Sequence, residues 1–396
     1  MVGLERTVLP LLGEREFGLE SQTAILSFIA TFGLVKAGTN WFAGAMADRI
    51  GRRRVLLLGW LAGVPVPFLV IAAPTWGWIV AANVLLGVNQ GLAWSTTVIM
   101  KIDLVGPERR GFAMGLNEFA GYLAVGLTAF ATGVVAQRFG LRPEPFYLGI
   151  GFAAVGLALS ALLVRDTMGH VRLETSQRGC ETGAAPGAGE AFARVSWRDP
   201  SLMACAQSGL VNNLNDGVAW GLFPLLFAAA GLDLARIGIL TAAYPTAWGV
   251  LQLVTGPASD RWGRKPLIVG GMLVQGAALG AIALGHGFGI WLAATVLLGG
   301  GTAMVYPTLL AAIGDRAAPS WRGSAVGVYR FWRDMGYVAG ALGAGWLADR
   351  AGIPAAIAGA GALTAASGLL AGLRLEETAP LGAASLRTHT ARQAGP

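Results

Sequence analysis

Ionisable side chains lie inside long apolar stretches of this 396-residue chain. They are Glu5, Arg6, Lys36, Glu118, Asp216, Arg330, Arg333 and Asp334. A charge inside a membrane costs at least about 2.5 kcal/mol on insertion scales, so such groups normally face a partner or a water-filled cavity. Acids and bases in that setting can hold an ionic solute or carry protons. A static ion pair that fixes helix register is the structural alternative.

A polar run, residues 212–217 (Asn-Asn-Leu-Asn-Asp-Gly), interrupts one of these apolar stretches. Asparagine and glycine weaken helices, and weakened helices line the cavities of transporters. We therefore predict that Asn212, Asn213, Asn215 and Asp216 touch a solute, together with Glu5 and Arg6. For Asn212 and Asn213, hydrogen bonding between helices is the alternative.

The composition is that of a membrane protein, with 54% hydrophobic residues, 13% charged residues and 59 glycines. Apolar stretches of about 20 residues, enough to cross a hydrocarbon core of about 30 Å as helices, recur along the chain. We predict an all-α integral membrane fold with eleven complete spans and a partial first one. The complete spans are expected near residues 21–47, 55–73, 77–102, 111–136, 145–164, 201–229, 236–259, 267–285, 289–313, 323–347 and 354–373.

A charged loop sequence occurs twice, each time between two apolar stretches. Residues 44–53 (GAMADRIGRR) recur in the later part of the chain as residues 256–265 (GPASDRWGRK). Such a repeat predicts two homologous halves, the usual construction of secondary transporters. We expect an N-terminal bundle at residues 1–164, a central linker at 165–200, a C-terminal bundle at 201–375 and a tail at 376–396.

The first apolar stretch is short. Residues 9–12 (LPLL) resemble residues 223–226 (FPLL), which lie well inside the corresponding later stretch. If that helix needs roughly 20 residues to cross the membrane, about ten to fifteen are missing. The expectation is a misplaced start codon or a truncated product.

Arginine and lysine gather in the loops on one side of the predicted spans, and that side is expected to be cytoplasmic, as is the C-terminus. The net charge of +7 then reflects topology and contact with anionic lipid, with no need for nucleic acid. The expected location is a bacterial-type inner membrane that the chain crosses many times.

The chain has six plus six spans, a central linker and the motif Gly-x-x-x-Asp-Arg-x-Gly-Arg-Arg/Lys after the second span of each half. In these features it resembles the major facilitator superfamily over essentially its whole length. The resemblance implies two pseudo-symmetric six-helix bundles. It also implies a cytoplasmic latch, in which Asp48 meets the helix that begins near Gly323 and Asp260 meets the one near Gly111. The predicted gate residues are Gly44, Asp48, Arg49, Gly51, Arg52, Arg53, Gly256, Asp260, Arg261, Gly263, Arg264 and Lys265, with Arg110 and Arg322 at the facing helix starts. Arginines that only anchor the loops to the cytoplasmic side are the alternative.

The second and eleventh spans meet in proteins of that family, as do the fifth and eighth, which implies that Lys36 pairs with Asp334, or Arg333 with another carboxylate. The spacing between the two loop copies also places Arg330 at the position that corresponds to Glu118, so opposite charges occupy symmetry-related sites. Two departures matter. Asn83 stands where many members have an arginine, and the fifth span lacks the Gly-Pro motif of drug/proton antiporters. Both departures make multidrug efflux a less favoured function.

Other classes of function have little support in the residues. The chain has no Gly-x4-Gly-Lys-Ser/Thr loop and no set of cysteines or histidines arranged to hold a metal, and no nucleophile-base pair occurs in a span. We predict a carrier without cofactor or metal, not an enzyme. It moves a small solute by alternating access, coupled to protons, as a monomer surrounded by lipid. A uniporter and a non-transporting receptor of the same fold are the alternatives.

Overall fold

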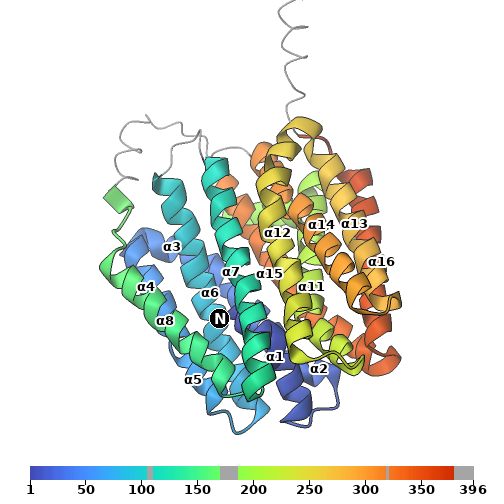
Figure 1. The fold of residues 1–396 in the computed structure, drawn as a ribbon. Coiled ribbons are helices and arrows are strands. Elements are labelled where there is room, and N and C mark those ends of the chain that lie inside the picture. Colours follow the sequence, from blue (N-terminus) through green and yellow to red (C-terminus); the bar gives the residue numbers. More distant parts are fainter. Residues whose placement is uncertain (105–109, 170–185, 318–320, 379–396) are drawn as a thin grey trace, which may run out of the picture.

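The computed structural model describes residues 1–104, 110–169, 186–317 and 321–378, and within its helices the side chains of residues 44, 45, 48, 102, 103, 110–115 and 188 lie outside that description. The described ranges form helices joined by short connections, with no strand among them. The helices run side by side along one direction (Figure 1). The predicted all-α fold is confirmed.

The described residues of the first half form eight helices. They are α1 (Val2–Arg15), α2 (Gln22–Ile25), α3 (Ser27–Ile50), α4 (Arg52–Gly63), α5 (Pro65–Ile71), α6 (Trp76–Leu104), α7 (Arg110–Phe139) and α8 (Glu144–Leu162). Helices α2 and α3 follow each other through Leu26 on the expected second span. Pro65 begins α5 and so divides the expected third span, because proline cannot donate the backbone hydrogen bond that a helix interior needs.

The second half follows a linker whose described residues include a short helix, α10 (Ala188–Ala193), and a π-helical turn, η2 (Arg194–Arg198). Its helices are α11 (Pro200–Ala229), α12 (Leu234–Trp262), α13 (Arg264–Leu284), α14 (Phe288–Arg316), α15 (Arg322–Ala351) and α16 (Ile353–Arg374). Asp199 caps α11 by accepting from the backbone N–H groups of Ser201 and Leu202 at 2.9 and 3.0 Å.

Seven stretches of helix in the described ranges are long and apolar enough to cross a membrane. These are Arg52–Ile71, Leu116–Phe139, Glu144–Leu162, Leu234–Trp262, Arg264–Leu284, Phe288–Arg316 and Ile353–Arg374. Helices α11 and α15 have 30 residues each, and they carry the polar run and the pair Arg333 and Asp334. Most of α11 is buried, so the protein surrounds its polar residues and shields them from lipid.

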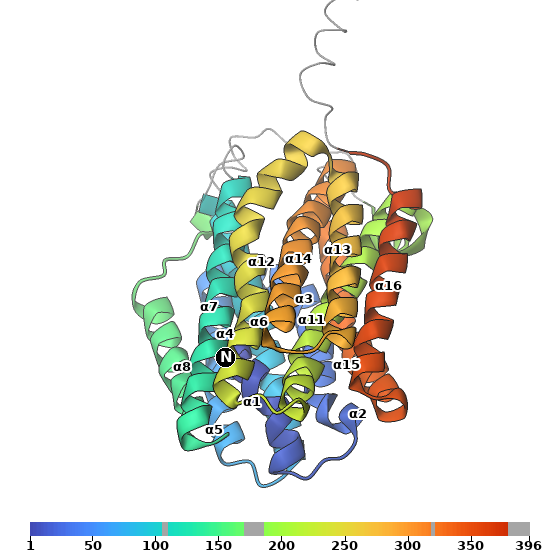
Figure 2. The same ribbon diagram turned by 45° about the vertical axis from the view of Figure 1, so that its right-hand side comes forward.

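The two halves lie side by side, with α7 along α12 and α3 along α15 (Figures 1 and 2). Helices α3 and α12 end on one face of the molecule, here called the linker face. Helices α7 and α15 end on the opposite face, here called the far face. Aromatic rings join the halves, since Phe32 contacts Trp220 and Tyr337 with ring centroids 5.2 and 5.5 Å apart. The N-terminus lies part-way between the two faces (Figure 1).

Candidate functional site between the two halves

An ion pair joins the first half to the second through helix α1. The Arg6 guanidinium lies 2.7 Å from an Asp216 carboxylate oxygen on α11, and both side chains are almost fully buried. The Tyr337 hydroxyl on α15 donates to the other carboxylate oxygen at 2.6 Å. The guanidinium also lies 5.4 Å from the centre of the Trp220 ring, a cation–π contact. Arg6 and Asp216, each predicted to touch a solute, thus lie in one buried cluster.

A second ion pair joins α3 to α15. The Lys36 ammonium lies 3.5 Å from a carboxylate oxygen of Asp334, whose side chain is fully buried. Asn40, one turn after Lys36, donates to the other Asp334 oxygen at 2.5 Å, and Ser95 on α6 donates to Asn40 at 2.6 Å. The structure therefore contains the pairing of Lys36 with Asp334 that the resemblance implied.

Arg333 points into a group of aromatic rings. Its guanidinium donates to the Tyr122 hydroxyl on α7 at 3.1 Å and lies 4.4 Å from the centre of the Tyr306 ring. Tyr122 in turn stacks on Trp248 with ring centroids 3.5 Å apart. The Arg333 Nε is buried and has no hydrogen-bond partner among the described residues. A buried donor without a partner is costly, so this atom is suited to a solute oxygen.

Glu118 lies one turn before Tyr122 on the same face of α7. One of its carboxylate oxygens accepts from Trp94 at 3.2 Å and from Asn117 at 3.1 Å. The other oxygen is buried and has no hydrogen-bond partner in the described part of the chain. Asn117 also accepts from the Lys101 ammonium. A carboxylate and an arginine with free polar atoms therefore border one aromatic cluster.

Two more predicted residues have different surroundings. Glu5 is buried, and the Asn83 amide nitrogen lies 3.4 Å from one of its carboxylate oxygens. Asn83, which replaces the arginine of many family members, therefore faces a carboxylate. Arg330 is half-buried, and no hydrogen bond or ion pair between described residues joins it to Glu118. Their symmetry-related positions do not bring these two charges together.

Two members of the polar run hold helices of the second half together. The Gln275 amide on α13 donates to Asn212 at 3.0 Å and accepts from Asn215 at 3.0 Å. Thr364 on α16 donates to Asn215 at 2.8 Å. These interhelical hydrogen bonds agree with the alternative given for Asn212, and contact of Asn212 and Asn215 with a solute stays a prediction. Positions three apart share a helix face, and this face points away from the first half.

Asn213 lies on the face of α11 that packs against α15. A side chain at Gly336 would lie 3.0 Å from the Asn213 Cβ. Asn213 is buried, and neither of its amide atoms has a hydrogen-bond partner among the described residues. It shares this face with Asp216, so these two remain candidates for contact with a solute or proton.

Replacing Gln275 by leucine is expected to lower the free energy of unfolding by about 1 to 3 kcal/mol, because two buried asparagine amides lose their partner. The KM for a transported solute should stay unchanged. Thermal unfolding in detergent and uptake kinetics measure the two effects. Gln252→Leu is the matched control: Gln252 is buried with an unpartnered amide nitrogen, so its loss should barely change the Tm. An equal fall in Tm for both variants contradicts the account.

Comparison with known proteins decides the family. The sequence model of the major facilitator superfamily matches residues 5–211 and, as a second repeat, residues 205–392. The chain belongs to this superfamily. A superfamily member of Salmonella typhimurium, described as an uncharacterised transporter, is 25% identical over 346 residues, which is 85% of this chain and 83% of that protein.

Two further members show the range of the superfamily. A chloramphenicol efflux pump of Mycobacterium tuberculosis is 25% identical, over 84% of this chain and 76% of its own. The xylose transporter of Escherichia coli, solved in a partially occluded inward-open conformation, has a similar fold, with a TM-score of 0.73 at 14% identity and 95% coverage of both chains. This chain is therefore a superfamily membrane transporter, and the superfamily's members are generally not enzymes.

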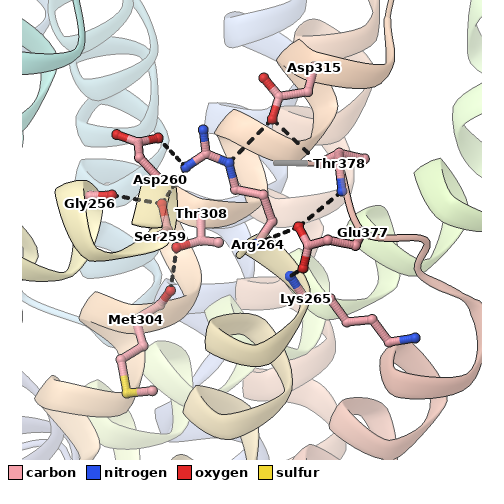
Figure 3. Close-up of polar contacts among 10 residues, drawn as sticks. All are labelled: Gly256, Ser259, Asp260, Arg264, Lys265, Met304, Thr308, Asp315, Glu377 and Thr378. Atoms are coloured by element: carbon pink, nitrogen blue, oxygen red, sulfur yellow. Dashed lines mark hydrogen bonds and ion pairs between the residues drawn. The ribbon is translucent and has the colours of Figure 1, made fainter. Parts of the chain in front are cut away.

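The second copy of the superfamily's loop motif is folded back on its own half (Figure 3). The Arg264 guanidinium contacts Asp260 at 2.6 Å and Asp315 at 3.2 Å. Glu377 accepts from the backbone N–H groups of Arg264 and Lys265 at 2.8 and 3.1 Å, which caps the start of α13. The Asp260 side chain is 64% exposed. In this structure Asp260 therefore pairs within its own loop. The latch against the start of α7 involves side chains outside those described and stays a prediction.

The first copy is described only in part. Arg52 donates to the Ala47 carbonyl at 3.0 Å, and the Arg53 backbone N–H donates to Asp166 at 3.0 Å. Arg49 and Arg261 are exposed, and Arg322 donates to the Ala317 carbonyl at 3.3 Å. The latch predicted for Asp48, with Gly44 beside it and Arg110 opposite, involves side chains outside those described. Gly51 and Gly263 close the two copies with positive φ angles of 94° and 100°.

Sequence reasoning missed several partners of the predicted charges. Tyr122 and Tyr337 lie four residues after Glu118 and Arg333, and Asn40 lies four after Lys36, so each shares a helix face with a predicted residue. That spacing was the available signal. Asp166 and Glu377 lie just after the sixth and last predicted spans, and each caps the helix that follows a loop motif. The separation of Asp166 and Glu377 along the chain nearly equals that of the two loop copies. This similarity could have indicated that the two residues play corresponding roles.

Proposed function

We propose that this chain is a proton-coupled secondary carrier that moves a small solute by alternating access between two six-helix bundles, with the linker face toward the cytoplasm of a bacterial cell. The observation that supports it best is the pair of buried salt bridges between the halves, Arg6 with Asp216 and Lys36 with Asp334. Both cations belong to the first half and both anions to the second. Rotation of one half against the other breaks both pairs, so they are suited to form in one access state only.

The proposed solute site lies between Arg333 and Glu118, against the rings of Tyr122, Trp248 and Tyr306. The free Arg333 Nε suits an anionic or carbonyl oxygen of the solute. The free Glu118 oxygen suits an amine, a hydroxyl or a proton. The rings provide flat apolar contact. We therefore propose a small organic solute with at least one acidic or strongly polar group.

Purified full-length protein in proteoliposomes tests the function directly. The solutes are a panel of sugars, organic acids, zwitterions, oxyanions and drugs, and a pH-sensitive dye inside the vesicles reports proton movement. Uphill uptake of one class driven by a pH gradient supports the proposal. Downhill movement without a dye signal identifies a uniporter, and movement of nothing under any gradient favours the receptor alternative.

Glu118→Gln is expected to separate proton movement from solute movement. The glutamine keeps the shape of the side chain but cannot exchange a proton, so uphill uptake should fall at least about tenfold while exchange of solute for solute continues. Accumulation and exchange are measured on the same vesicles with the dye present. Arg236→Gln, a change at an exposed arginine of the far face, is the control. A full proton signal in Glu118→Gln removes Glu118 from the pathway.

A further inference from the structure

The loop motif has two more relatives, both at helix ends on the far face. Residues 345–352 (GWLADRAG) end α15, and residues 133–140 (GVVAQRFG) end α7. Their separation along the chain equals that of the two linker-face copies. Their closing glycines, Gly352 and Gly140, have φ angles of 86° and 97°, as the closing glycines of the linker-face copies do. The pattern Gly-x-x-x-Asp/Gln-Arg-x-Gly thus occurs at the end of each of four helices, α3, α7, α12 and α15.

The α15 copy forms hydrogen bonds with the other half of the protein. The Asp349 carboxylate accepts from the backbone N–H groups of Gln22 and Thr23 at 2.5 and 3.1 Å, and from the hydroxyls of Ser21 and Thr23 at 2.9 and 2.6 Å. These groups form the start of α2, where helix N–H groups lack internal partners. A side chain at Gly345 would lie 2.8 Å from the Thr23 Cα, so only glycine permits this approach.

The carboxylate is held in its charged form. Partial burial acts to raise its pKa, but the hydrogen bonds from Thr23, Gln22 and Ser21 outweigh burial and lower the pKa of Asp349 below its ordinary value. A depressed carboxyl pKa means that the contact is complete at neutral pH and is lost only as the pH falls through that lower value.

The α7 copy makes the corresponding contact in the opposite direction. The Gln137 side-chain oxygen accepts from the backbone N–H of Leu234, the first residue of α12, at 2.8 Å. A side chain at Gly133 would lie 2.7 Å from the Gly238 Cα. On the far face, each half therefore caps one helix of the other half.

The linker face contrasts with this arrangement. Among the described residues, a side chain at Gly256, Gly323 or Gly327 would meet no atom within 4 Å, and Asp260 is 64% exposed. Between described residues, the same motif is thus engaged across the halves on the far face, whereas these linker-face positions show no such contact.

We propose that Asp349 and Gln137 form an outer latch, which holds the far face closed when the carrier is open toward the linker face and releases when the carrier opens outward. The proposal rests on the alternating access proposed above. Each latch residue acts as a cap on a helix of the opposite half, so its loss favours the outward-open population. Four related motifs, two on each face, would then alternate.

The difference between aspartate and glutamine follows from the helix that each one caps. The start of α12 already carries Asp233, which accepts from the Arg236 backbone N–H at 2.8 Å. A second carboxylate there would meet a like charge, whereas an amide oxygen accepts the hydrogen bond without repulsion. The start of α2 has the neutral Ser21 as its own cap, which leaves room for the charge of Asp349.

Accessibility of a buried cysteine from outside the cell tests the latch without any solute. Leu26→Cys is introduced into a full-length chain in which Cys180 and Cys205 are replaced by serine. Leu26 is fully buried, and its side chain packs against Gly221 of the other half, so it becomes reachable only when the far face opens. The measurement is the rate of labelling by a membrane-impermeant maleimide in intact cells.

Asp349→Ala is expected to raise the labelling rate about fivefold, the effect of losing one good helix cap. Gln137→Ala should raise it less, and the two together more than either. Asp349→Asn keeps an acceptor oxygen, so its labelling rate should lie between those of the unmodified chain and Asp349→Ala. It tests the latch even if the alanine variant does not fold. Asp233→Ala removes a cap on the same face within one half and should leave the rate within about twofold of the unmodified chain.

Three outcomes overturn the latch. The first is an unchanged rate in Asp349→Ala and Asp349→Asn, and the second is an equal rise in Asp233→Ala, which indicates general loosening. The third is labelling only in inside-out vesicles, which places the far face in the cytoplasm. Because labelling needs no solute, a chain that transports nothing can still pass this test, and a working transporter can fail it.

Discussion

Arg333→Gln is expected to lower the initial rate of solute uptake on the order of 100-fold, the loss of a buried charge-assisted contact worth a few kcal/mol. The Arg333 side chain is 7% exposed, and its guanidinium contacts the Tyr122 hydroxyl, the Tyr306 ring and, at 4.0 Å, a carboxylate oxygen of Asp334, so no solvent-exposed charge can replace it. Uptake into proteoliposomes at saturating and at low solute concentration separates a change in kcat from a change in KM. We expect most of the effect in KM.

Arg333→Lys sharpens the result, because lysine keeps the charge and loses the planar fork of donors. We expect it to restore part of the rate for a solute that binds through charge, and little for one that needs two parallel hydrogen bonds. Tyr122→Phe, which removes only the hydroxyl contact, should cost less than either. Unchanged uptake in Arg333→Gln would remove the proposed solute site.

Asp216→Asn is expected to destabilise the protein by about 3 to 5 kcal/mol, because it leaves the buried Arg6 guanidinium without its counter-charge. Arg6→Gln alone leaves Asp216 unpaired but keeps the Tyr337 hydrogen bond, so its effect should be smaller. The double variant should regain most of the lost stability. Thermal unfolding in detergent of the four proteins forms a double-mutant cycle and gives the coupling energy.

Transport by the double variant then distinguishes a switching pair from a static one. A pair that only fixes helix register can be replaced by neutral groups without loss of rate, whereas a pair that must break and re-form cannot. We expect transport to remain impaired although the fold recovers. Additive effects on stability would mean that Arg6 and Asp216 do not interact.

The helices and their pseudo-symmetry could be predicted from the sequence because apolar length and repeated loops are local signals. Arginine and aspartate inside an apolar run also indicate a buried site by their residue types alone. The pairing of Lys36 with Asp334 came from the resemblance, which supplied the contact between the second and eleventh spans. The sequence alone could not have placed those two residues together.

Helix rotation limits the prediction of side-chain partners, because a single sequence does not specify it. Asn212 and Asn215 looked like cavity residues because they neighbour Asp216, but a rotation of about 100° per residue directs them to α13 and α16. The far-face motif copies were missed for another reason. Gln137 replaces the acid and both copies lack the following basic pair, so only their common spacing along the chain links them to the loops that were noticed.

The segregation of charge in the two ion pairs has an electrical consequence. Arg6 and Lys36 stand on one wall and Asp216 and Asp334 on the other. If the two halves separate with no solute bound, each ion pair loses an attraction of about 4 kcal/mol, for a separation of about 4 Å and an effective dielectric constant of about 20. The separated charges can be neutralised only by a proton, an ion or a charged solute. In the proposed carrier, opening outward without a solute would thereby be disfavoured, which would protect the cell's ion gradients from leakage.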